Sequence, residues 1–172
     1  MMIERLSPSH AGDYRALMLE AYAAHPDAFT STVAEREKLP IEWWESRLSP
    51  DPSPRHVVLG AFQAVELAGV VGLSFEQREK VRHKATLFGM YVRPRFRGQG
   101  IGRQLVQSAL KHARERPAVL VVQLTVTEGN APAVSLYESC GFVPFGVEPL
   151  AVAVTSGYVS KLHMWRRVGT AE

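Results

Sequence analysis

Cysteine is almost absent from the sequence, and the features of membrane and exported proteins are missing. The 172 residues contain one cysteine, Cys140, which rules out an intrachain disulfide. No Cys/His cluster has the spacing of a zinc site, and no run of about 18 apolar residues could cross a bilayer. Glu4 and Arg5 stand where a signal peptide would need an apolar core. We therefore expect a soluble, cytoplasmic protein that holds no structural metal and contacts no membrane.

The net charge of +3 is small, but it is distributed unevenly along the chain. Residues 93–116 hold seven Lys or Arg and one acid, whereas residues 1–54 hold five Lys or Arg and nine acids. A nucleic-acid partner would need basic residues beyond this one segment, and the acidic first third would repel a polyanionic strand. The charge distribution therefore favours a small anionic ligand over nucleic acid.

No internal repeat, low-complexity segment or clear linker divides the chain, so we predict one domain over residues 1–172. Alternating or Val-rich stretches predict strands, and apolar residues at helical spacing, with Ser7 and Asn130 as N-caps, predict helices. The expected strands are 2–6, 55–64, 66–77, 85–92, 118–126, 142–149 and 158–168, and the expected helices are 8–25, 41–48, 101–116 and 130–142.

The second half of the chain contains the pattern of a parallel crossover. The stretch AVLVVQLTV, residues 118–126, is typical of a strand buried on both faces, as in a parallel sheet. The helix before it places apolar side chains on one face at i, i+4 spacing, at Ile101, Leu105, Ala109 and Ala113. We therefore expect an α/β fold in which a strand–helix–strand unit follows a meander of antiparallel strands.

The glycine-rich segment RPRFRGQGIG, residues 93–102, lies between a predicted strand and a predicted helix. Glycines let the backbone approach a ligand closely, and a helix N-terminus presents unpaired N–H groups and positive charge. The turn therefore suits phosphate or pyrophosphate, with charge added by Arg93, Arg95, Arg97 and Arg103. The chain lacks GxxxxGK[ST], which excludes a P-loop, and Arg103 stands where the dinucleotide fingerprint needs its third glycine.

The remaining interpretation is a coenzyme A pyrophosphate turn, and two motifs support it. Arg95, Gly98 and Gly100 fill the pattern [RQ]-x-x-G-x-[GA], which resembles motif A of the GNAT acetyltransferase superfamily. Residues 130–142, NAPAVSLYESCGF, fill its motif B pattern, N-x-x-A-x-x-L-Y-x-x-x-G-F. The order of predicted elements matches that superfamily over almost the whole chain. The resemblance implies a mixed, mostly antiparallel sheet of about six to seven strands, with splayed central parallel strands and about four flanking helices.

The resemblance also implies acetyl transfer, or another acyl transfer, from coenzyme A to an amine. Acetyl-coenzyme A would enter the slot between the splayed strands, pair with the backbone of the fourth strand and place its pyrophosphate on the glycine turn. By position, the residues implied in binding it are Met90, Tyr91, Val92, Arg97, Gly98, Gln99, Gly100, Ile101, Gly102, Arg103, Asn130, Ala133 and Tyr137.

Two catalytic groups are implied as well. A backbone N–H near Met90 would stabilise the oxyanion that develops when the amine attacks the thioester. Tyr137 would give a proton to the departing thiolate, a task suited to a phenol with a pKa of ~10. The superfamily often carries a glutamate on the fourth strand as general base, but KATLFGMY contains no acid here. Glu76, Glu128 and His163 are substitute candidates, so the base stays unassigned.

The acceptor pocket is the part of the site about which the sequence says least. The superfamily builds it from the first two helices and the last hairpin. Aromatic and acidic side chains of this region could form a wall that binds a cationic amine. Alternatively, most of the aromatic side chains are core residues and most of the acidic ones lie on solvated helix faces, and we favour this interpretation. The residues concerned are Tyr22, Trp43, Trp44, Glu20, Glu35, Glu37, Glu42 and Glu45, while Phe29, Glu76 and Glu128 are the expected acceptor contacts.

We expect an N-acetyltransferase that acts on a primary amine of a small molecule, such as an amino acid, a polyamine or an amino-bearing antimetabolite, by direct attack in a ternary complex. Acetylation of a protein N-terminus or lysine is the first alternative, and it predicts a shallow open groove. A non-catalytic sensor of acyl-coenzyme A is the second, because the fourth strand lacks an acid. The resemblance also suggests a homodimer formed through strand edges.

Overall fold

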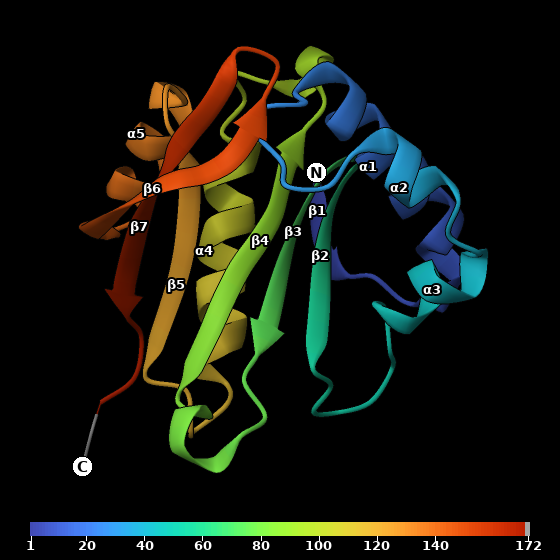
Figure 1. Cartoon of the computed structure of the whole chain (residues 1–172). Coiled ribbons are helices and arrows are strands. Elements are labelled where there is room, and N and C mark those ends of the chain that lie inside the picture. Colours follow the sequence, from blue (N-terminus) through green and yellow to red (C-terminus); the bar gives the residue numbers. More distant parts are fainter. Residues whose placement is uncertain (171–172) are drawn as a thin grey trace.

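The structure, a computed structural model, describes residues 1–170 and contains a seven-stranded sheet in the order β1-β2-β3-β4-β5-β7-β6 (Figure 1). Neighbouring strands are antiparallel except β4 and β5. This confirms the expected mixed, mostly antiparallel fold. The strands are β1 (Met2–Arg5), β2 (His56–Gln63), β3 (Glu66–Phe75), β4 (Lys84–Val92), β5 (Val121–Thr127), β6 (Val143–Val154) and β7 (Gly157–Arg167). The helices are α1 (Ala11–Ala24), α2 (Val33–Glu37), α3 (Ile41–Ser46), α4 (Ile101–Arg114) and α5 (Ala131–Ser139).

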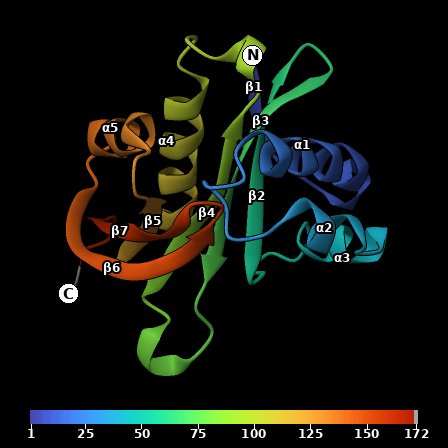
Figure 2. The same cartoon turned by 45° about the horizontal axis from the view of Figure 1, so that its top comes forward.

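Helices cover both faces of the sheet, as the two views show (Figures 1 and 2). Val57 and Leu59 of β2 belong to the core beneath α4 and α5, whereas Val58 and Phe62 pack with α1 and α3 on the other face. This is the period-2 alternation of a strand. Because both faces are covered, β2 and β3 are buried along almost their whole length.

β5 differs from the prediction of a strand buried on both faces. Val122, Leu124 and Val126 are buried in the core beneath α4, but Thr125 is exposed and Gln123 is half-buried. The apolar run therefore overstated burial, because the second face of β5 opens onto a cleft. The strands buried on both faces are β2 and β3, in the antiparallel meander.

The cleft arises because β4 and β5 separate after a short parallel ladder. Their register runs from Lys84↔Val121 to Thr86↔Gln123, yet β4 continues to Val92 and β5 to Thr127. Beyond the ladder, the facing edges of the two strands do not pair with each other. This confirms the expected splayed pair and leaves backbone donors and acceptors of β4 facing the gap.

The two helices beside the cleft are built as the sequence predicts. The apolar stripe of α4, from Ile101 to Ala113, is buried. The Asn130 side-chain oxygen accepts a hydrogen bond from the Ala133 N–H at 3.3 Å and so caps α5. Gly141, with φ of +86°, follows the helix in the left-handed conformation that ends it.

α2 is not among the helices expected from the sequence, and it brings the helices to five within the described residues. Its N-terminus is a capping box: Thr32 Oγ1 accepts from the Glu35 N–H at 3.1 Å, and Glu35 Oε2 accepts from the Thr32 N–H at 3.0 Å. The string T-V-A-E carries this signal. In addition, Pro8–His10 forms a 3₁₀ turn, so α1 begins at Ala11 rather than at Pro8.

The last two strands form a hairpin at the edge of the sheet, and it curls toward the segment between α1 and α2 (Figures 1 and 2). β6 continues past the predicted end at Pro149, through Leu150 with φ of +51°. Lys161 Nζ of β7 donates to Thr30 Oγ1 at 2.9 Å and joins the hairpin to that segment. None of the helices within residues 1–170 has the length and apolar character that a bilayer crossing needs.

Candidate active site

Two adjoining cavities lie in and around the gap between β4 and β5. The tyrosine cavity, of about 310 Å³, lies among α1, α2, β4, β5 and α5 and includes the ring of Tyr137 in its lining. The glycine-turn cavity, of about 450 Å³, follows the end of β4 to the start of α4. Phe29, Met90 and Asn130 line both cavities, so the two form one continuous cleft.

β4 carries a β-bulge where the two cavities meet. The register with β3 shifts between Val70 and Gly72, and this leaves Gly89 and Met90 of β4 opposite the single residue Val71. Gly89 has φ of +60°, a conformation that a side chain would strain. A bulge leaves one residue out of the ladder, so not all backbone N–H and C=O groups of this segment are hydrogen-bonded to β3. Met90, the predicted oxyanion donor, lies in this bulge.

The glycine turn is open on the side of its cavity. Gly98 and Gly100 have φ of +76° and +75°. Among residues 1–170, no atom would come within 4 Å of a Cβ built on Gly98, and a Cβ on Gly100 would meet only Gln104 Nε2, at 3.9 Å. By contrast, a Cβ on Gly102 would lie 3.1 Å from Met90 Cε, so this glycine lets α4 pack closely on β4. The space beside the first two glycines is what a phosphate-binding turn requires.

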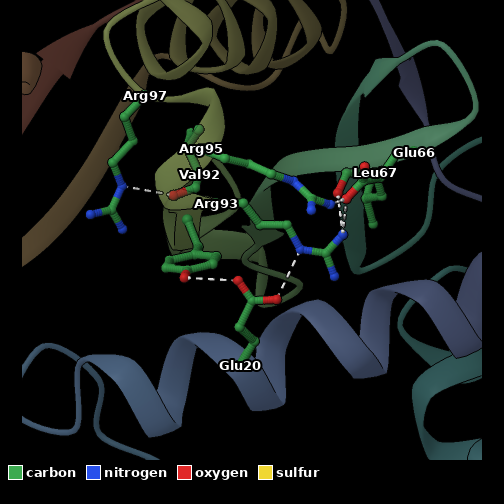
Figure 3. Close-up of polar contacts among 8 residues, drawn as sticks. Glu20, Glu66, Leu67, Val92, Arg93, Arg95 and Arg97 are labelled. Atoms are coloured by element: carbon green, nitrogen blue, oxygen red, sulfur yellow. Dashed lines mark hydrogen bonds and ion pairs between the residues drawn. The ribbon is translucent and has the colours of Figure 1, made fainter.

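Two of the four arginines of the turn are neutralised by carboxylates (Figure 3). Arg93 donates to Glu20 Oε2 at 2.9 Å and to Glu66 Oε1 at 3.1 Å, and Arg95 also pairs with Glu66. These ion pairs tie the end of β4 to α1 and β3. Contrary to the expectation from sequence, Arg93 and Arg95 therefore act as structural links and add little charge to a phosphate site.

Arg97 and Arg103 supply the charge at the glycine-turn cavity, which both of them line. Arg97 extends away from Arg93 in Figure 3, and its Nε donates to the Val92 carbonyl at 2.9 Å. The Val92 carbonyl, a predicted backbone partner of the pantetheine arm, is therefore already engaged. Arg97 Nη2 also lies 3.1 Å from His25 Nε2, a cavity residue that the sequence analysis missed.

Tyr91 and Gln99 are predicted binding residues whose side chains have other partners. The Tyr91 hydroxyl donates to Glu20 Oε1 at 3.2 Å, and burial, reinforced by the Glu20 carboxylate, raises the pKa of this phenol. The Gln99 side chain accepts from Gln63 Nε2 at 3.3 Å, and Gln99 does not belong to the lining of the glycine-turn cavity. Only the backbone groups of these two residues remain candidates for ligand contact.

Tyr137 presents a protonated phenol to the tyrosine cavity. Its side chain is 7% exposed and packs edge-on against Phe142, with ring centres 5.9 Å apart. Burial, with a smaller effect of Cys140, raises the pKa of Tyr137 well above its usual value, so the phenol keeps its proton through the neutral range.

Neither of the two carboxylates proposed as bases, nor the histidine, belongs to the lining of the tyrosine cavity or of the glycine-turn cavity. Glu76 follows the end of β3, which lies beside the start of β4 rather than beside the bulge. Glu128 Oε2 accepts from the Ser160 N–H at 3.0 Å, and His163 Nε2 lies 2.8 Å from Glu148 on the hairpin. Neither Glu76 nor Glu128 lines the tyrosine cavity, so the cavity lining does not support their contact with the acceptor, which stays a prediction.

The aromatic half of the expected acceptor wall is present, but the acidic half is not. Phe29 and Tyr22 line the tyrosine cavity with ring centres 5.3 Å apart, whereas Trp44 is a core residue, 1% exposed. Glu20 pairs with the turn, and Glu35 caps α2. No Asp or Glu from residues 1–170 lines this cavity, and the charged side chains that do are Arg36, Arg47 and Lys161.

The residues present fit acetyl-coenzyme A. Open glycines and two arginines without carboxylate partners in the described residues suit a pyrophosphate. The unpaired edge of β4 beyond Thr86 suits the amide groups of an extended arm. A mixed sheet whose central parallel strands part beside such a turn defines the acyltransferase class that binds coenzyme A.

The comparisons specify the family. The acetyltransferase (GNAT) family profile matches residues 16–142, and the chain belongs to this family. The chain is also similar to the crystal structure of an acetyltransferase of the GNAT family from Streptococcus pneumoniae. The TM-score is 0.86 at 27% identity, and the match covers 98% of this chain and 99% of that one.

Three curated relatives have names that specify different acceptors. The mycothiol acetyltransferase of Thermobispora bispora is 31% identical over 138 residues, which cover 77% of this chain and 43% of that protein. The [ribosomal protein bS18]-alanine N-acetyltransferase of Escherichia coli K12 is 31% identical over 100 residues, 58% of this chain and 64% of that protein. The L-amino acid N-acetyltransferase AaaT of the same strain is 25% identical over 154 residues, 90% and 91% of the two chains. The chain thus spans less than two thirds of the first two relatives.

Proposed function

We propose that this protein is an N-acetyltransferase that uses acetyl-coenzyme A to acetylate a primary amine of a small molecule. One observation carries the proposal: the tyrosine cavity is lined by α1, α2, β4, β5 and α5 and adjoins the glycine-turn cavity, with which it shares lining residues. A cavity of only about 310 Å³ suits a small acceptor better than a protein segment. The family and the relatives that are named N-acetyltransferases support acetyl transfer to nitrogen.

In this proposal the glycine-turn cavity holds the cosubstrate, which supplies the acetyl group. The backbone N–H groups of Gly98 to Gly102, with Arg97 and Arg103, bind its pyrophosphate. The β4 backbone at Met90 and Tyr91 pairs with the pantetheine arm. Asn130 and Ala133, which line both cavities, contact the same arm near its end.

The chain supplies two groups for chemistry at the junction of the cavities. The Met90 N–H in the bulge donates a hydrogen bond to the negative charge that develops on the acyl oxygen. The Tyr137 hydroxyl donates a proton to the sulfur as it leaves. No carboxylate of the described residues lines the tyrosine cavity, so the amine loses its proton to solvent rather than to a side-chain base.

A second candidate is acetylation of a protein N-terminus. Its support is the relative named for the alanine of a ribosomal protein. It requires room for a peptide, whereas Lys161 joins the hairpin to Thr30 across one side of the cleft. We therefore rank the small-molecule acceptor first.

A thiol-release assay with acetyl-coenzyme A and a panel of amines, run as a pH series, tests the proposal. We expect thiol release that depends on one class of small amine. Release only with peptides would establish the second candidate. If no amine or peptide releases thiol while calorimetry shows coenzyme A binding, the protein is a sensor and the proposed activity is wrong.

A further inference from the structure

The tyrosine cavity carries positive charge for which the proposed reaction has no use. We propose that Arg36, Arg47 and Lys161 recognise a carboxylate on the acceptor, so that the substrate is an amino acid or a closely similar amino-carboxylate. This inference rests on the proposed function and specifies its acceptor. It also argues against the less favoured alternative from the sequence, an acidic wall for a cationic amine.

The three cations come from separate elements and have no carboxylate partner. Arg36 lies in α2, Arg47 follows α3, and Lys161 lies in β7, and all three are half-buried. None of the ion pairs within residues 1–170 includes any of them. A partly buried charge loses hydration, and it is normally paired. A ligand anion would provide that pairing.

Neutral neighbours hold these side chains in place at the cavity. Arg36 Nη2 donates to Ser31 Oγ at 2.8 Å, and Lys161 Nζ donates to Thr30 Oγ1 at 2.9 Å. The guanidinium carbons of Arg36 and Arg47 lie 4.5 and 4.7 Å from the ring centre of Trp43. Each cation therefore has a fixed position and retains further N–H donors for a ligand.

The rest of the lining fits the apolar part of a small amino acid. Met18, Phe29 and Phe88 line the same cavity, and the Arg47 guanidinium carbon lies 5.1 Å from the Phe88 ring centre. A planar carboxylate matches the donor fork of arginine. A polyamine would instead place further positive charge beside three cations, which disfavours it.

The decisive experiment compares acceptors that differ only in their carboxylate. We would measure kcat/KM for L-methionine, L-methioninamide and 3-(methylthio)propylamine, and for L-phenylalanine, L-phenylalaninamide and phenethylamine. The amides have less basic amines, so without charge recognition the amide should react faster than the acid. We expect the acid of at least one series to exceed both partners by at least about 10-fold, the size of a lost charged hydrogen bond.

Variants assign the preference to the cations. Arg47→Gln and Arg36→Gln should bring the ratio of acid to amide to within about twofold, whereas Arg78→Gln, the same charge change at an exposed loop, should leave it unchanged. Thermal unfolding shows whether each variant is folded. If a variant does not fold, the ratio of kcat/KM for the acid to that for the amide in the wild type still decides the inference. Amides or decarboxylated amines that react as well as the acids would overturn the inference and leave the proposed function intact. Silence from every amine would overturn both.

Discussion

At the scale of single residues, Tyr137 has the most specific of the proposed chemical roles. We expect Tyr137→Phe to lower kcat by about 100-fold, because a positioned general acid contributes roughly 10²–10⁴-fold. The KM for acetyl-coenzyme A should change by less than about twofold, since the ring and its packing on Phe142 remain. Steady-state kinetics with the acceptor at saturation measures both parameters.

The pH dependence of kcat provides a second test of this residue. Burial raises the pKa of Tyr137, so its protonated form, which is the proposed acid, persists to higher pH than an exposed phenol would. We therefore expect ionisation of Tyr137 to cause no decrease in kcat between about pH 7 and pH 9.5. Any decrease in this range should be the same in the wild type and in Tyr137→Phe. If the Phe variant is fully active, another group or water protonates the sulfur.

At the scale of elements, the end of β4 separates arginines held in ion pairs from arginines proposed to bind the ligand. Arg93→Gln removes ion pairs to α1 and β3, and we expect a loss of about 1–2 kcal/mol in the free energy of unfolding, or about 2–8 °C in Tm. Its Kd for coenzyme A should stay within about twofold. Arg97→Gln should show the reverse, with a Kd raised by about 3–10-fold and an unchanged Tm. Calorimetry and thermal unfolding of both variants check the assignment, and a large Kd change in Arg93→Gln would refute it.

The glycine turn makes a similarly sharp prediction. Gly100→Glu adds bulk, a strained backbone and a negative charge beside the pyrophosphate site, so coenzyme A binding should weaken by more than about 100-fold. Gly157→Glu is a matched control, because Gly157 also has positive φ and begins β7 directly after the β6–β7 turn. Binding measured by calorimetry should be unchanged in this control. Equal affinities of Gly100→Glu and wild type would remove the glycine turn from the site.

Elements with a local signal could be predicted from sequence, whereas contacts between distant elements could not. The α4 stripe, the Asn130 cap and the glycine turn are readable because neighbouring residues determine them. α2 was readable too, from its capping box, but it is short. The lining of the tyrosine cavity was not readable, because Arg36 and Lys161 look like solvated charges until the fold brings their elements together. For the same reason, the ion pairs of Arg93 were invisible in the sequence.

At the scale of the whole molecule, the free edge of the sheet bears on assembly. β6 is the last strand of the sheet, and its Val147 and Leu150 are 67% and 76% exposed. Exposed apolar residues on an edge strand favour pairing with another chain. The homodimer therefore stays a prediction, with β6 as its proposed interface.

Light scattering tests this prediction directly. We expect the wild type to have twice the mass of one chain and Val147→Lys to shift toward the monomer. Val65→Lys is the control, since Val65 is 94% exposed in the β2–β3 turn, away from β6. A monomeric wild type at micromolar concentration would contradict the prediction.

The positive lining of the tyrosine cavity also has a consequence for the acceptor's proton. The carboxylate of a free amino acid stabilises its ammonium group, and pairing that carboxylate with Arg36 and Arg47 cancels the effect. Nearby positive charge further lowers the pKa of the amine. Acceptor binding should therefore expel a proton into the solvent, so that the nucleophile forms at the binding step without a side-chain base. Titrations in buffers of different ionisation enthalpy, with coenzyme A bound, would reveal this release as a buffer-dependent heat, and a heat independent of buffer would show that the ammonium form binds.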